Sequence, residues 1–115
     1  MNWSAAGAIL LALAVILGAF GAHGLRGRLD AYSMGIYEKA VFYHFIHALG
    51  ILVVSSLRRT PWICGLLLAG IVLFSGSLYV LAISGVRELG AITPFGGLAF
   101  IAAWLLLAWS LRRPA

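Results

Sequence analysis

Two histidines and a tyrosine are close enough in the chain to act together: His47 follows His44 by three residues and Tyr43 by four. Residues at these spacings lie on one face of an α-helix. An imidazole changes its charge near neutral pH, with an ordinary pKa of ~6.5, and it is a common metal ligand. This helix face is therefore a candidate binding site. His23 and Arg87 are expected at a similar depth. Ser77, in the middle of the third helix, completes the set as a residue that could bond across to the second helix or line a path.

The cluster is compatible with three kinds of chemistry. It could bind or pass a small polar ligand near one membrane face, relay protons through its histidines, or hold a metal or haem. For a metal, His44 and His47 would share one ion with His23, and Glu38 is the nearest candidate for a fourth ligand. Haem would need a histidine that faces a wide pocket. The structural alternative is that each histidine hydrogen-bonds a neighbouring helix and fixes its register.

No enzyme class is indicated by the sequence. It contains no nucleophile elbow, no phosphate-binding loop and no pair of carboxylates at useful spacing. We therefore assign no catalytic residue and leave the cofactor and the ligand unknown. Binding or transport is the first functional hypothesis, and a structural or assembly role through helix packing is the second.

Four long runs without any Asp, Glu, Lys or Arg must position these residues. A run of about 18 residues at ~1.5 Å per residue nearly crosses a hydrocarbon core of ~30 Å. Hydrophobic residues make up 63% of the 115-residue chain and the mean hydropathy is +1.08, which excludes a water-soluble domain. We predict an all-α fold, a single domain over residues 1–115 with four transmembrane helices at about 4–22, 38–57, 62–84 and 94–111.

The longest connection, residues 25–39, mixes charged side chains with tyrosines and apolar residues. Such a composition suits the level of the lipid headgroups, so we predict an interfacial segment between the first and second helices. Gly24 is expected to end the first helix in the left-handed conformation and Gly85 to end the third. Thr93 and Pro94 form a start signal for the fourth.

Four spans place both termini on one side of the membrane. Each side carries four basic residues, so the positive-inside rule gives no decision by number. On the side of the termini, arginine pairs directly follow the spans. On the other side, Asp30, Glu38 and Glu88 offset part of the positive charge, and this difference favours cytoplasmic termini. The net charge of +5 is assigned to contacts with the lipid bilayer, and nucleic acid is excluded as a partner.

Small residues recur within the spans. Lipid gives helices no hydrophobic reason to associate, so close packing at small residues must hold them together. Five glycines are expected to serve this purpose: Gly18, Gly21, Gly76, Gly96 and Gly97. Because four short helices enclose little volume, a homo-oligomer is a further expectation.

Four stretches give the chain a family resemblance: GAFGAHGL at 18–25, YHFIHALGIL at 43–52, FSGSLY at 74–79 and SGVRELGAITPFGG at 84–97. In order and spacing they resemble the family called domain of unknown function 423, which includes transmembrane protein 256. The resemblance implies a small multi-pass protein of the bacterial inner membrane without a cleaved signal. It implies no activity, but it places the six candidate site residues inside the family's motifs.

Overall fold

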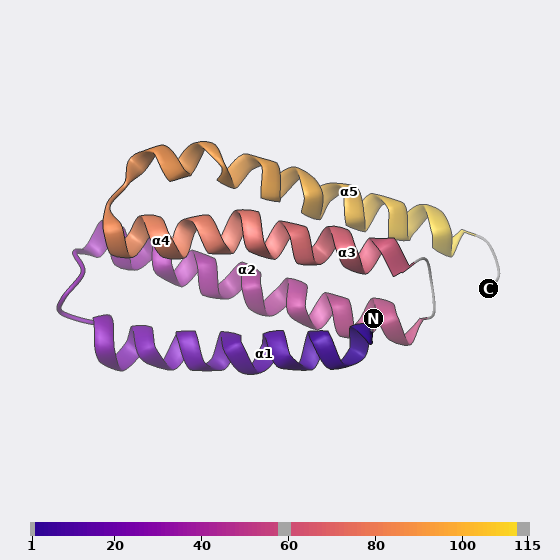
Figure 1. The fold of residues 1–115 in the computed structure, drawn as a ribbon, viewed down its shortest axis with the longest axis horizontal. Helices are drawn as coiled ribbons and strands as arrows, with labels where there is room; N and C mark the ends of the chain where they lie inside the picture. The colour runs from indigo at the N-terminus through magenta and orange to yellow at the C-terminus, as the bar shows by residue number, and fades with distance from the viewer. Residues whose placement is uncertain (1, 58–60, 113–115) are drawn as a thin grey trace.

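The computed structural model describes residues 2–57 and 61–112, and Figure 1 shows their helices side by side along the long axis of the molecule. Four helical spans are long and apolar enough to cross a membrane. They cover Trp3–Leu25, Ala31–Ser56, Pro61–Ser84 and Arg87–Leu111. The predicted all-α bundle of four transmembrane helices is confirmed.

The first span starts and ends at residues that its sequence explains. Its α-helix, α1 (Trp3–Phe20), begins where the side chain of Asn2 accepts a backbone hydrogen bond of 3.0 Å from the first turn. It continues as a π-helical stretch, Gly21–Leu25. The π turn carries the chain past Gly24, so the residue with positive φ is Gly27, at 86°, and the prediction of a left-handed Gly24 was wrong.

The second span begins about two turns earlier than predicted. Helix α2 (Ala31–Ser56) starts after Asp30, whose carboxylate accepts a hydrogen bond of 2.7 Å from the backbone N–H of Ser33. This cap lets the polar stretch that follows form regular helix. The interfacial segment predicted over residues 25–39 is therefore reduced to a short connection, 26–30.

The third span is one continuous helix of mixed geometry. It consists of α3 (Pro61–Gly70), a π-helical segment over Ile71–Gly76, and α4 (Ser77–Ser84). Gly85 ends it with a φ of 74°, as predicted. The π-helical segment has no counterpart in the predicted pattern of uniform helices.

The fourth span ends the bundle. Residues Arg87–Ala91 form a 3-10 turn, and α5 (Thr93–Leu111) follows with Pro94 in its first turn. Proline is well placed there because a first-turn N–H has no partner within the helix. Thr93, expected as the N-cap, is instead the first residue of the helix after Ile92, and its hydroxyl pairs with that of Ser77. Figure 1 shows the start of α1 and the end of α5 toward the same end of the bundle, opposite the connections 26–30 and 85–92.

The two middle spans carry the core. Helix α2 packs against α1 on one side and against α3 and α4 on the other, and α5 packs against α3 and the π-helical segment (Figure 1). In the most apolar 18-residue window of each span, 39% of the residues are buried in the second and third spans, but only 17% in the first and 22% in the fourth. The outer helices therefore present most of their apolar side chains to lipid.

The predicted packing glycines differ in how tightly they are enclosed. A Cβ on Gly96 would overlap the backbone of Phe74, and one on Gly21 would overlap the ring of Tyr37. Gly18 and Gly97 would make only ordinary contacts, and the nearest neighbour of Gly76 would be 4.0 Å away. Three further glycines stand at close helix contacts: Gly7, Gly50 and Gly70.

Candidate functional site

His44 lies in the interior of the bundle, roughly midway along the 26 residues of α2. Its side chain is 1% exposed. The Nδ1 atom lies 2.8 Å from the hydroxyl oxygen of Tyr79 on α4. The other ring nitrogen, Nε2, is buried and has no hydrogen-bond partner among the residues that the structure describes. The backbone of Leu10 on α1 approaches the ring as a weak hydrogen-bond partner.

His44 and Tyr79 both contribute to the wall of a crevice. This lateral crevice has a volume of about 240 Å³ and lies where α1, α2 and the third span meet. Its lining is apolar except for the His44–Tyr79 pair: Leu10, Leu13, Leu17, His44, Ile71, Val72, Gly76 and Tyr79. Leu13 is 42% exposed and Val72 is 61% exposed, so the crevice reaches the outer surface of the bundle, where lipid would lie.

The π-helical segment forms one wall of this crevice. Ile71, Val72 and Gly76 all come from it, and Tyr79 follows one turn later. Gly76 carries no side chain, and a Cβ there would meet only the carbonyl oxygen of Ile71, at 4.0 Å, so the crevice is not filled from this side. Single π turns within α-helices are rare and occur frequently at functional sites.

His47 lies one turn from His44 but in a different environment. Its Nδ1 donates a hydrogen bond of 2.8 Å to the carbonyl oxygen of Tyr43. Its ring stacks on Phe100 of α5 with a centroid distance of 3.5 Å and an angle of 12°. Tyr43 in turn packs on Phe74, with ring centroids 4.5 Å apart. His47 and Tyr43 therefore belong to an aromatic layer that joins α2 to α5.

The other three candidates are not joined to His44. His23 is exposed in the π turn that ends the first span. Arg87 is exposed too, and its guanidinium carbon lies 5.9 Å from the ring centroid of Tyr32. The hydroxyl of Ser77 lies 2.6 Å from that of Thr93 and ties α4 to α5.

A shared three-histidine metal site is not formed in this arrangement. Within residues 2–57 and 61–112, no three His, Cys, Asp or Glu side chains come together closely enough to hold an ion. His44 and His47 face different neighbours, and His23 is exposed near the end of the bundle. The predicted polar cluster near one membrane face is thus divided between the bundle interior and its polar end.

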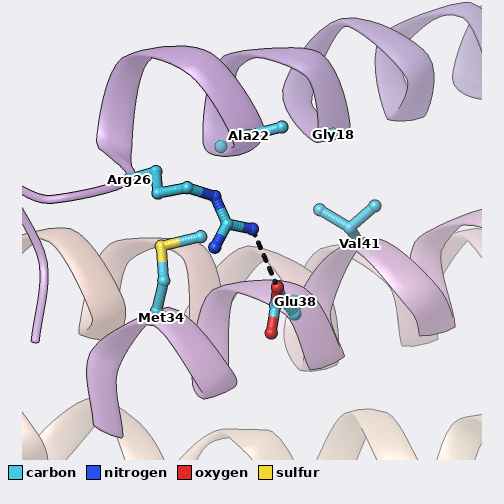
Figure 2. A pocket seen from close by; sticks show the side chains of 7 residues that line it. Gly18, Ala22, Arg26, Met34, Glu38 and Val41 are labelled. Atoms are coloured by element: carbon cyan, nitrogen blue, oxygen red, sulfur yellow. Dashed lines mark ion pairs between the residues drawn. The ribbon is translucent and has the colours of Figure 1, made fainter. Parts of the chain in front are cut away.

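Figure 2 shows the polar end of the bundle between the first two spans. Arg26 extends from the end of the first span toward Glu38 on α2, with 3.9 Å between Nη2 and Oε2. Both side chains are largely exposed, so this pair adds little to stability. The pair lines a pocket of about 130 Å³ whose other walls are small or apolar, including Gly18, Met34 and Val41.

Asp30 is the titratable group at this end whose ionisation is perturbed. The hydrogen bonds from the backbone and side chain of Ser33 lower the pKa of the Asp30 carboxyl, and the positive charge of Arg87 lowers it further. The carboxylate is therefore fixed in its charged form as the cap of α2. This accounts for its role without a ligand.

Three polar residues of the interior make contacts between spans. Tyr79, which the sequence analysis did not single out, is the partner of His44, Ser75 donates a hydrogen bond of 2.8 Å to the carbonyl of Ala40, and Tyr37 donates to the carbonyl of Leu17. Each contact joins residues at least 20 positions apart, so no local spacing could reveal it. The stretch FSGSLY, already noted for its motif, contains two of the three residues.

Comparison with known proteins supports the membrane architecture. Residues 17–97 match the family model described as "Protein of unknown function (DUF423)". A UPF0382 membrane protein of Staphylococcus haemolyticus is 49% identical over 106 residues, covering 88% of this chain and 87% of that protein. One from Staphylococcus epidermidis is 52% identical over the same shares, and YwdK of Bacillus subtilis is 47% identical over 88% of each chain. No solved structure is significantly similar to the chain.

Proposed function

The chain belongs to the DUF423 family of membrane proteins, and we propose that it binds a small lipid-soluble molecule in the lateral crevice, with His44 as the polar anchor. The observation that carries this proposal is an apolar crevice that opens at the lipid-facing surface and is lined by the His44–Tyr79 pair.

The shape of the crevice favours entry from the bilayer rather than from water. Its outer lining includes the exposed side chains of Leu13 and Val72, which face the hydrocarbon region in a spanning bundle. No Asp, Glu, Lys or Arg is among its lining residues. A charged solute would therefore lose its hydration without gaining a counter-ion. A molecule already dissolved in lipid would not.

The test compares two matched substitutions, His44→Phe and His47→Phe, in protein extracted from bacterial membranes into nanodiscs. Native mass spectrometry should detect an additional bound mass on the wild type and on His47→Phe, and none on His44→Phe. Thermal unfolding of all three proteins checks that the fold is kept. Equal bound mass on all three proteins, or none on any of them, would contradict a His44-dependent binding site.

An assembly role is the second proposal, and a different observation favours it. The windows of the first and fourth spans are only 17% and 22% buried, so α1 and α5 offer broad apolar faces to another membrane protein or to a second copy. Leucine at the exposed small residues Ala8 and Ala12 of α1 should then disrupt a cross-linked complex. His44→Phe should leave such a complex intact.

We further place the protein in the bacterial inner membrane with both termini in the cytoplasm. The support is the arginine pairs that directly follow the spans at the terminal end in the sequence. Labelling of single cysteines in intact cells, at Arg28→Cys and at Thr60→Cys, tests it. Labelling of position 60 but not of position 28 from outside would reverse the orientation.

A further inference from the structure

A second pocket, with charged walls, lies between the start of α2 and the end of α4. This Asp30–Arg87 pocket has a volume of about 190 Å³. Its lining includes two charged, two polar and two apolar side chains: Asp30, Arg87, Tyr32, Ser33, Ile36 and Leu81. Figure 1 shows the connections 26–30 and 85–92, which carry the charged pair, at the same end of the bundle. In a spanning bundle the pocket therefore stands at the level of the lipid headgroups.

The two charged groups have opposite signs, and both side chains are exposed. The guanidinium of Arg87 lies over the ring of Tyr32, with 5.9 Å between Cζ and the ring centroid. Its charge is near enough to lower the pKa of the Asp30 carboxyl, yet no ion pair joins Arg87 to Asp30 in the part of the chain that the structure describes. Both groups line the pocket without pairing across it, so each can bind a further group.

The capping role of Asp30 leaves acceptor positions free. Ser33 donates to the carboxylate from its backbone N–H, at 2.7 Å, and from its hydroxyl. An ionised carboxylate has about four acceptor positions, so the cap occupies only part of them. The cap explains why Asp30 is charged, but it does not explain the space between this charge and that of Arg87.

The arrangement fits a ligand that carries one negative and one positive group. A guanidinium donates paired hydrogen bonds to a phosphate, and a carboxylate accepts hydrogen bonds from a primary ammonium. A quaternary ammonium has no N–H to donate. A headgroup with a phosphate and no cation would bring a second negative charge near Asp30 without a compensating contact. The pair of charges therefore favours a zwitterion with a primary amine.

The apolar walls indicate that the rest of this ligand is lipid. Ile36 and Leu81 are half-buried and lie deeper along α2 and α4 than the charged pair. The hydrocarbon part of a phospholipid held by its headgroup would lie beside them. A cavity of about 150 Å³ holds benzene, and a phosphate joined to a two-carbon amine is only slightly larger. A volume of about 190 Å³ therefore suits one such headgroup.

We propose that the Asp30–Arg87 pocket binds the headgroup of a phospholipid with a primary amine, phosphatidylethanolamine, through its phosphate at Arg87 and its ammonium at Asp30. The glycerol end of the lipid lies beside Ile36 and Leu81. The pocket shares no lining residue with the lateral crevice, so this inference does not depend on the proposed function.

The experiment uses the full chain, freed of lipid in detergent, and three phospholipids with identical acyl chains. The headgroups are phosphoethanolamine, phosphocholine and phosphoglycerol. Native mass spectrometry measures the affinity of the first bound lipid. An exposed ion pair changes an affinity by up to about fivefold. We expect the ethanolamine lipid to bind about fivefold more tightly than either of the other two.

Substitutions assign this preference to the two charges. Asp30→Asn keeps a capping side chain but removes the negative charge, so it should abolish the preference for the ethanolamine lipid. Arg87→Gln should weaken the binding of all three lipids about fivefold. Glu88→Gln and Arg28→Gln are the matched controls, because both residues are exposed at the same end and neither lines the pocket. Both controls should bind as the wild type does.

The possible outcomes decide for or against the lipid site. Equal affinities for the three lipids, or a preference that survives Asp30→Asn, would overturn it. So would equal losses in Arg87→Gln and Arg28→Gln, because they would show a general effect of positive charge. Water-soluble phosphoethanolamine should not displace the lipid at equal concentration, and displacement would assign the pocket to a free solute instead. Thermal unfolding of every variant checks that the fold is kept.

Discussion

His44 and His47 stand one turn apart on α2, yet their rings meet opposite conditions. The ring of His47 is stacked on Phe100 and its Nδ1 is paired with a backbone carbonyl. The ring of His44 is equally buried, but one nitrogen has no partner among the described residues and its surroundings include a crevice. The difference teaches that two histidines of equal burial can have quite different surroundings, one within an aromatic stack and one beside a crevice.

The largest expected loss of stability tests whether the surroundings of His47 are packed more tightly than the crevice beside His44. Phe100→Ala removes a ring that is 4% exposed and contacts His47, so it should reduce the free energy of unfolding by about 3 kcal/mol. Leu13→Ala in the crevice wall removes a partly exposed side chain and should cost under about 1 kcal/mol. Equilibrium unfolding in detergent measures both. Similar losses would mean that the two sides are packed alike.

A smaller effect is expected when the histidine itself is removed from the packed side. His47→Ala loses both the stacking on Phe100 and the hydrogen bond to Tyr43, at about 2 kcal/mol. His47→Phe keeps an aromatic ring and should lose about half of that. The same unfolding assay applies. An equal loss in both variants would assign the role of His47 to its hydrogen bond alone.

On the crevice side, removing both polar partners should cost almost nothing in ligand-free protein. The double variant His44→Phe/Tyr79→Phe removes both ring nitrogens of His44 together with the Tyr79 hydroxyl that is hydrogen-bonded to one of them. The free energy of unfolding should therefore change by less than about 1 kcal/mol or rise. The single variant His44→Phe leaves the Tyr79 hydroxyl without its partner and should be less stable than the double variant. A large loss in the double variant would show that the pair stabilises the fold.

The smallest expected effect is the pH dependence of stability that arises from Asp30, at the polar end of the bundle. The pKa of Asp30 is lowered in the folded protein, so its capping interaction stabilises above the unfolded value of ~3.9 and is lost as the pH falls through the lower folded value. Asp30→Asn caps without titrating and should flatten the stability profile below about pH 4. Unfolding measured from pH 2 to 8 checks this. A difference confined to pH 6–8 would contradict it and would point to the histidines.

The spans could be read from the sequence because the absence of charge over about 18 residues is a local property. The start of α2 could not, because the polar residues of 31–39 resemble a headgroup segment until the Asp30 cap is recognised. His44 and His47 were expected on one helix face, and both are buried. Their partners, Tyr79 and Phe100, lie on other spans, and helical periodicity contains no information about which side chain faces which across a bundle.

His23 and Arg87 illustrate the same limit. Both were expected at the level of the other polar residues, and both lie at the connection end of the bundle. Position along a helix predicts depth, but at a helix end the side chain can turn toward water as easily as toward the interior. Both side chains are exposed. Only the three-dimensional arrangement separates them from His44.

The π-helical segment Ile71–Gly76 changes the direction in which the side chains that follow it point around the axis of the third span. Successive residues of an α-helix are rotated by about 100°, so deleting one residue to restore regular geometry would rotate all of α4 by roughly that angle relative to α3. Tyr79 would then turn away from His44, and Ser77 from Thr93, while the contacts of α3 remained in place. A single inserted residue thus lets one helix present two differently oriented faces, one to α5 and one to the crevice.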